Sequence, residues 1–173
     1  MKRFLALLIF FMALPTSAQA ATTIELTEIP HRQINGQFID DQLADLISPN
    51  GRLGKLIYQL PRGPKMWNID GALIDDISAM ANGYKLVDGK SGVGEADAKA
   101  WLARLKSVAY YQNINAIAYG NPSGYWIHRL NPHDESFYLS ASADHLSKFF
   151  GRSISPLPSY NSTKYFQLSS FQS

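Results

Sequence analysis

Asp70 is the residue of this sequence best placed to do chemistry, because it stands where an apolar run gives way to a helical pattern. The run covers residues 66–69, and Leu73, Ile77 and Met80 then recur at helical spacing. We predict a buried strand that turns directly into a helix, with the Asp70 carboxylate capping the first turn. Ligands of parallel α/β proteins bind outside the carboxyl ends of the strands, so Asp70 is also the candidate catalytic residue.

A second strand is expected to end beside Asp70. Residues 114–119 form an apolar run, and Asn121 follows it. A glycosidase uses a pair of carboxylates, and Asn121 cannot ionise, so the pair is incomplete. Asp75 and Asp76 lie a turn further along the helix and are not expected to complete it. A capping role for Asp70 is therefore favoured over a catalytic one.

Asp40 and Asp41 are similar to the paired acids of metal-dependent deacetylases. Those acids work with a His-x-x-x-His pair, because a metal ion needs several ligands that converge on it. The histidines here are His31, His128, His133 and His145, and no two have that spacing. We therefore predict no metal site and no cofactor. Asp40 and Asp41 are expected to favour the N-terminal end of a helix dipole instead.

Aromatic side chains, 12% of the sequence, crowd the second half of the chain. Sugars stack their apolar faces on such rings, so one interpretation is a glycan groove. The candidate binding residues are Tyr119, Asn121, Tyr125, Trp126 and His31. The alternative, packing in the core or against a partner, is favoured for the rings.

These side chains must be positioned by a succession of strands and helices. The alternating pattern of residues 22–29 predicts a first strand that Pro30 ends. Helical patterns follow at residues 39–47, 53–60, 95–110 and 141–150. The two strands at 66–69 and 114–119 are joined through helices, so they are expected to be parallel. The predicted fold class is α/β, a small parallel sheet with flanking helices.

The start of the chain has the pattern of an export signal. Lys2 and Arg3 precede an unbroken apolar run over residues 4–14, Pro15 breaks this run, and residues 18–20 (Ala-Gln-Ala) form a small-x-small cleavage site. We therefore predict a secreted or extracytoplasmic protein associated with the cell envelope. If the signal is not cleaved, the chain contacts the membrane through this segment alone.

The expected organisation is a signal peptide over residues 1–20, an α/β domain over residues 21–152, and a poorly ordered tail rich in Ser, Pro and aromatic residues over residues 153–173. Without Lys2 and Arg3, 14 basic side chains balance 14 acidic ones, which argues against a nucleic-acid-binding protein. The sequence contains no cysteine, so disulfides, thiolate metal sites and a cysteine nucleophile are excluded.

Six short stretches carry a resemblance to a known family. They are residues 30–32 (Pro-His-Arg), 38–44 (Phe-Ile-Asp-Asp-Gln-Leu-Ala), 48–53 (Ser-Pro-Asn-Gly-Arg-Leu), 67–70 (Trp-Asn-Ile-Asp), 101–105 (Trp-Leu-Ala-Arg-Leu) and 118–122 (Ala-Tyr-Gly-Asn-Pro). In this order they resemble uncharacterised secreted envelope proteins of actinobacteria, whose central region is similar to a (β/α) barrel of the polysaccharide-deacetylase type. The resemblance covers about residues 24 to 152 and implies part of such a barrel.

The chain departs from this family at both predicted strand ends. The family usually has proline after the residue equivalent to Asp70, where this chain has Gly71. At the second strand the family usually reads Tyr-x-Asp-Pro-Asp, and this chain has Asn121 and Ser123 in place of the two acids. Any chemistry that those acids do in the family is therefore lost here.

Three functional hypotheses follow. The first is an exported, non-catalytic envelope protein that binds glycan or another envelope protein. The second is a carbohydrate-active enzyme, a glycoside hydrolase or deacetylase-like protein, that uses Asp70. The third is a truncated remnant of a larger family member. The first is preferred, because Asp70 lacks a second acid.

Overall fold

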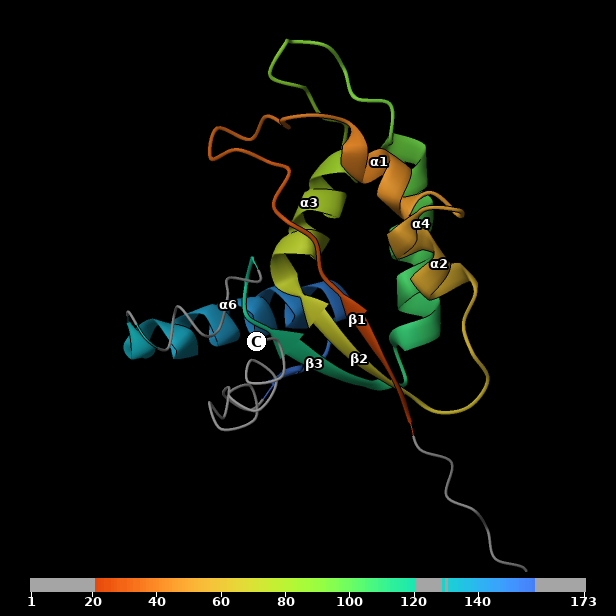
Figure 1. The fold of residues 1–173 in the computed structure, drawn as a ribbon, viewed down its shortest axis with the longest axis vertical. Helices are drawn as coiled ribbons and strands as arrows, with labels where there is room; N and C mark the ends of the chain where they lie inside the picture. The colour runs from red at the N-terminus through yellow and green to blue at the C-terminus, as the bar shows by residue number, and fades with distance from the viewer. Residues whose placement is uncertain (1–20, 121–128, 130, 158–173) are drawn as a thin grey trace, which may run out of the picture.

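The computed structural model describes residues 21–120, 129 and 131–157, and shows a parallel sheet with helices packed on it (Figure 1). The predicted signal peptide and most of the predicted tail lie outside these residues. No helix in the described part of the chain is both long enough and apolar enough to cross a membrane.

Parallel strands form the sheet in the order of the chain. They are β1 (Thr22–Leu26), β2 (Lys65–Asp70), β3 (Asn113–Ile117) and β4 (Ser155–Pro156). β2 pairs in parallel with both β1 and β3, which confirms the predicted crossover. β4 lies in the segment predicted to be a poorly ordered tail. It extends the sheet beyond β3, and the Leu157 N–H donates to the Ala116 carbonyl at 2.7 Å.

The described helices are α1 (Gln42–Ile47), α2 (Arg52–Tyr58), α3 (Gly71–Ala81), α4 (Glu95–Ala109) and α6 (Pro132–Phe150). α3 and α4 connect β2 to β3, and α3 packs against both α4 and α6. The indole N–H of Trp101 on α4 donates to the Leu53 carbonyl on α2 at 3.3 Å. These contacts pack the helices against one another beside the sheet, and the predicted α/β fold class is confirmed.

α6 is longer than the sequence pattern predicted. The prediction began this helix at residue 141, whereas it begins at Pro132, with Asp134 and Glu135 in its first turn. Its first half is largely exposed, including Phe137 at 67%, so it lacks the apolar periodicity that marks a buried helix face. The predicted end is correct, because Gly151 follows the last turn with a left-handed φ of 68°.

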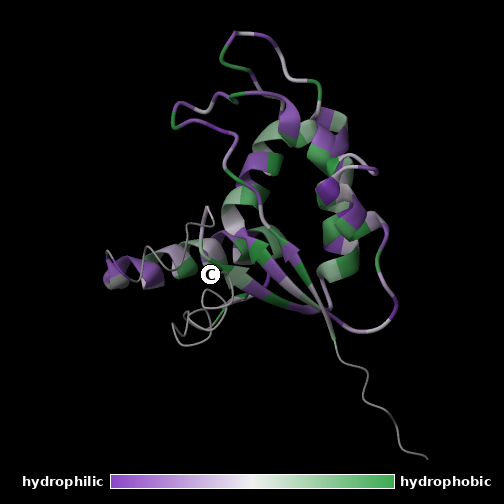
Figure 2. Ribbon diagram, viewed as in Figure 1, coloured by the Kyte–Doolittle hydropathy of each residue, from purple (hydrophilic) through white to green (hydrophobic). Residues whose placement is uncertain are grey.

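The two faces of the sheet differ in character. Side chains on one face, including Leu26, Trp67, Ile69 and Ala116, are fully buried in the core with the helices. The alternate residues point to the opposite face and are polar for the most part, so that both kinds of residue follow one another along the strands (Figure 2). We call this opposite side the open face, since Thr23, Glu25 and Asn113 on it are exposed.

Candidate functional site

Asp70 caps α3 as predicted and also fixes the loop after β3. Its Oδ1 accepts the Ala72 N–H at 2.8 Å and the Gly120 N–H at 2.9 Å. The Asp70 residue is completely buried. One oxygen therefore holds both the first turn of α3 and the turn that follows β3.

Gly71 allows α6 to approach the start of α3 closely. Its N–H donates to the Ser142 hydroxyl at 2.8 Å. A Cβ atom at Gly71 would lie 2.9 Å from the Cα atom of Ser142. Proline has no N–H to donate, and its ring would occupy this space. Proline at position 71 would therefore remove this contact.

The environment of Asp70 disfavours its charged form. Burial raises the pKa of Asp70 to about 6, the hydrogen bonds from Ala72 and Gly120 act against this, and the charges of Asp76 and Asp75 add to the rise. The second carboxyl oxygen, Oδ2, is buried and has no hydrogen-bond partner among the described residues.

Asp75 on α3 links the segment after β3 to α6. The Tyr119 hydroxyl donates to Asp75 Oδ2 at 2.8 Å, and His145 Nδ1 lies 2.6 Å from the same oxygen. The Tyr119 and His145 rings are 5.1 Å apart between centroids. Burial raises the pKa of Tyr119 above its ordinary value, and the hydrogen bond to Asp75 adds to this. Asp75, which was not expected to complete a carboxylate pair with Asp70, instead binds Tyr119 and lies beside His145.

Asp76 binds the segment that follows β1. Arg32 Nε donates to Asp76 Oδ1 at 3.0 Å, and the His31 backbone N–H donates to Oδ2 at 3.2 Å. Burial raises the pKa of Asp76, although the His31 N–H and the Arg32 charge act to lower it. Asp76 thereby joins α3 to this segment, and its charge also adds to the rise in the pKa of Asp70.

The predicted binding residue His31 is buried, with 5% of its surface exposed. Its Nδ1 lies 3.2 Å from Asp40 Oδ1, and the same Asp40 oxygen accepts the Gln42 N–H at 3.0 Å at the start of α1. Asp41 accepts a hydrogen bond from the Tyr84 hydroxyl. These acids therefore hold loop and helix together, and no three His, Cys, Asp or Glu side chains of the described chain converge as metal ligands.

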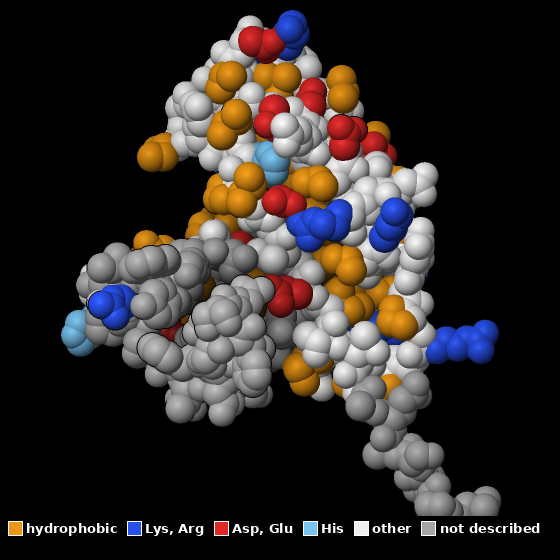
Figure 3. Space-filling model, viewed as in Figure 1, with side chains coloured by type: hydrophobic (Ala, Val, Ile, Leu, Met, Phe, Trp, Pro, Cys, Tyr) orange, Lys and Arg blue, Asp and Glu red, His pale blue; other side chains and the backbone are white. Residues whose placement is uncertain are grey.

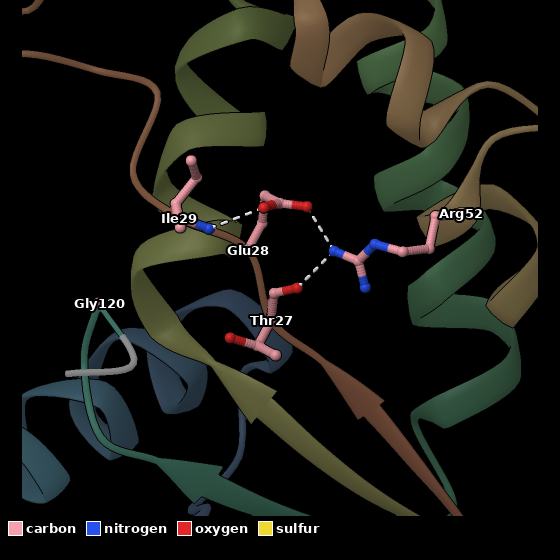
Figure 4. A pocket seen from close by; sticks show the side chains of 5 residues that line it. All are labelled: Thr27, Glu28, Ile29, Arg52 and Gly120. Atoms are coloured by element: carbon pink, nitrogen blue, oxygen red, sulfur yellow. Dashed lines mark hydrogen bonds and ion pairs between the residues drawn. The ribbon is translucent and has the colours of Figure 1, made fainter. Parts of the chain in front are cut away.

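A pocket of about 240 Å³ opens at the carboxyl ends of the strands (Figure 4). It is lined by Thr27, Glu28, Ile29, Arg52 and Gly120. Arg52 Nη2 donates to the Thr27 carbonyl at 2.8 Å and forms an ion pair with Glu28. Ile29 is 71% exposed. The pocket thus combines a carboxylate, a guanidinium and an aliphatic side chain.

Hydrogen bonds keep the Glu28 side chain of the pocket in its charged form. Burial acts to raise the pKa of Glu28, but the hydrogen bonds from Arg52 and from the Ile29 N–H outweigh it and leave this pKa below its ordinary value. Glu28 is consequently ionised at neutral pH. Charges of both signs are interspersed on this side of the molecule, rather than separated into patches (Figure 3).

The predicted site residues Asp70 and Tyr119 each bind a residue that was not predicted as part of the site. Gly120 lines the pocket and binds Asp70, and the neighbouring Tyr119 binds Asp75. The other predicted binding residues, Asn121, Tyr125 and Trp126, lie outside the described residues.

Sequence reasoning missed Glu28, Arg32, Arg52 and His145. Each acts through a partner far along the chain, such as Glu28 with Arg52 or His145 with Asp75. Neither a motif nor a periodic pattern connects such partners, so only the fold could identify them.

No protein-family model matches this chain, and no curated protein matches it. The resemblance to secreted envelope proteins therefore stays a prediction.

Proposed function

We propose that this protein is an exported cell-envelope protein that binds glycan without catalysing a reaction on it. The observation that supports binding is the pocket formed by Thr27, Glu28, Ile29, Arg52 and Gly120. It lies at the carboxyl ends of parallel strands, which is where proteins of this class bind ligands. Export follows from the signal pattern in the first twenty residues.

The chemistry of the pocket suits a sugar. The Glu28 carboxylate accepts hydrogen bonds and the Arg52 guanidinium donates them, so together they serve neighbouring hydroxyl groups. The exposed Ile29 side chain offers an apolar surface to the C–H groups of a sugar ring. The volume of about 240 Å³ lies below the roughly 300–1,000 Å³ of pockets for drug-sized ligands. We therefore assign the pocket to one sugar unit of a longer chain.

The environments of the acids argue against catalysis at this pocket. Asp70 is completely buried, so its carboxyl group does not contact a substrate. Glu28 has a lowered pKa and pairs with Arg52, whereas a general acid must hold a proton near the working pH. A bound glycan consequently meets no proton donor of the required kind among these two acids.

The test is isothermal titration calorimetry on residues 21–173 with soluble oligosaccharide fragments of cell-wall glycan. We expect Arg52→Gln and Glu28→Gln to weaken binding about tenfold or more, because each removes a charged hydrogen-bonding group. Arg62→Gln and Glu95→Gln are the matched controls, since both residues are exposed and lie outside the pocket. Failure of the folded wild-type chain to bind any fragment, or unchanged affinity of both pocket variants, would refute the proposal.

A carbohydrate-active hydrolase is the second candidate, and the pair of Asp75 and His145 favours it. Their side chains are 26% and 45% exposed, so both are accessible, unlike Asp70. A histidine whose Nδ1 faces a carboxylate can accept a proton at Nε2. Release of reducing sugar or acetate from cell-wall glycan that stops with His145→Gln, but continues with His133→Gln on the same helix, would establish this candidate in place of the first.

A further inference from the structure

One line of side chains crosses the whole sheet on the open face. In the pairing register, Glu25 on β1 lies opposite Asn68 on β2, Asn68 opposite Asn115 on β3, and Asn115 opposite Ser155 on β4. Side chains of paired residues point to the same face of a sheet. These four residues therefore form a continuous polar row, which is the name used below.

The polar row is accessible to a ligand. Glu25 and Ser155 are exposed, and Asn68 and Asn115 are half-buried. The large buried side chains of β1 and β2, such as Leu26 and Trp67, point to the opposite face, where the helices pack. Because these side chains pack on the helix-facing side of the sheet, the polar row lies on the side away from them.

Hydrogen-bonding groups are repeated along the row. Asn115 Nδ2 donates to Asn68 Oδ1 at 3.2 Å. Asn68 Nδ2 and Asn115 Oδ1 have no partner among the described residues, which leaves one donor group and one acceptor for a ligand. Neighbouring strands are about 4.8 Å apart, so the four positions span on the order of 14 Å. The row can thus contact several units of an extended polymer.

The chemistry of the open face selects the kind of ligand. Among its described residues no lysine or arginine is present, and Glu25 is its exposed charge. An anionic polymer such as a nucleic acid has no cation to pair with there. Met66 and Ile117, in the rows on either side, are half-buried and offer limited apolar contact. Amides, a carboxylate and a hydroxyl beside small apolar patches suit a neutral, hydroxyl-rich chain.

The row lies close in sequence to one wall of the pocket. Thr27, which lines the pocket, lies two residues beyond Glu25 and directly follows the last residue of β1. Two residues of a strand cover about 7 Å. A polymer with one unit in the pocket can therefore place its next units on the row.

We infer that the polar row is a second glycan subsite, which binds the sugar units next to the one in the pocket. This inference rests on the proposed function. It extends that function from recognition of a single unit to recognition of an oligosaccharide that lies across the strands. It also predicts that affinity increases with the length of the glycan.

The test is calorimetric titration with β-1,4-linked N-acetylglucosamine oligomers of one to five units. Wild-type affinity should rise with length. Asn68→Ala and Asn115→Ala should weaken binding of the longer oligomers about tenfold and leave binding of the single unit unchanged. Arg52→Gln should weaken binding of the single unit and of the longer oligomers alike. Asn50→Ala, at an exposed loop position, is the matched control. Glu25→Ala, on an exposed position of β1, gives a second row variant that does not disturb the core.

The outcomes separate the two claims. Binding of the single unit with no gain in affinity for longer oligomers, or row variants that bind the pentamer as wild type does, would refute the inference and leave the pocket assignment standing. If the folded wild-type chain binds none of the oligomers, both the pocket assignment and the polar-row inference are refuted. Thermal melting of each variant shows whether it is folded, and Glu25→Ala decides the question if either asparagine variant is not.

Discussion

The backbone N–H of Gly71 donates to the side-chain hydroxyl of Ser142 at 2.8 Å, at a point where α3 and α6 approach each other too closely for a Cβ atom on Gly71. This contact attaches the start of the helix after β2 to the middle of the helix that precedes β4. The close approach of α6 to α3 thus depends on two small residues, Gly71 and Ser142.

Changes to this contact should destabilise the fold. Gly71→Ala should lower the free energy of unfolding by about 1–3 kcal/mol, because the new methyl group overpacks against Ser142. Ser142→Ala should cost a similar amount, about 1–3 kcal/mol, since it leaves a buried N–H without an acceptor. Urea unfolding measures both. Ser140→Ala, an exposed position on the same helix, should stay within about 0.5 kcal/mol of wild type.

Asp70 should make stability depend on pH. Its pKa is raised to about 6 in the folded protein, from an ordinary value of 3.8, so the folded state holds a proton that the unfolded state releases between these values. The corresponding stabilisation is fully present below pH 3.8 and is lost as pH rises through about 6. It amounts to on the order of 2–3 kcal/mol at 1.36 kcal/mol per pKa unit.

Asp70→Asn isolates this effect, because asparagine keeps the acceptor for Ala72 and Gly120 and does not titrate. Relative to wild type, the variant should gain stability between pH 4 and pH 7, as measured by urea unfolding across that range. A stability difference that stays constant with pH would contradict the raised pKa of Asp70. Asp70→Ala, which removes the acceptor, should cost about 1 kcal/mol in the capping interaction.

Tyr119 should stabilise the junction of β3, α3 and α6. Tyr119→Phe removes the hydroxyl that donates to Asp75 and should cost about 1 kcal/mol. In a double-mutant cycle with Asp75→Asn the two effects should not add, because both changes disturb the same hydrogen bond. Tyr111→Phe, at a residue that is 91% exposed, should be silent in the same unfolding assay. Additive effects of the first two changes would show that the hydroxyl and the carboxylate act independently.

The predicted signal peptide can be tested directly. Mass spectrometry of protein recovered from the extracytoplasmic fraction should give Ala21, or a residue next to it, as the N-terminus. Replacing Leu7 and Leu8 by charged residues should interrupt the apolar run and retain the precursor in the cell, and Leu157→Lys serves as a control outside the signal. Recovery of intact Met1 in a soluble cytoplasmic form would contradict the assignment.

Local patterns predicted the parts of the fold that local physics determines. The Asp70 cap is an example, since the strand, the acid and the first turn of α3 are contiguous in sequence. β4 escaped prediction because it has two residues, one of them Pro156, and so shows no alternation. Its place in the sheet depends on β3 and on the length of α6.

The candidate site was less predictable than the fold, because its interactions join distant segments. No role of its own was predicted for Arg52, yet Arg52 reaches Glu28 and the Thr27 carbonyl beyond β1. The polar row depends on strand register, which a single sequence does not reveal. Asn68 and Asn115 each look like an ordinary polar residue of an alternating strand until the pairing places them side by side.

The shared acceptor at Asp70 also has a consequence for native-state hydrogen exchange. The Ala72 and Gly120 amides donate to the same oxygen, although one begins a helix and the other follows a strand. Opening either segment without the other leaves a buried carboxyl group short of a donor, which raises the free energy of partial opening. The two amides should therefore exchange with deuterium at similar protection and lose it together under mild denaturant, as members of one cooperative unit.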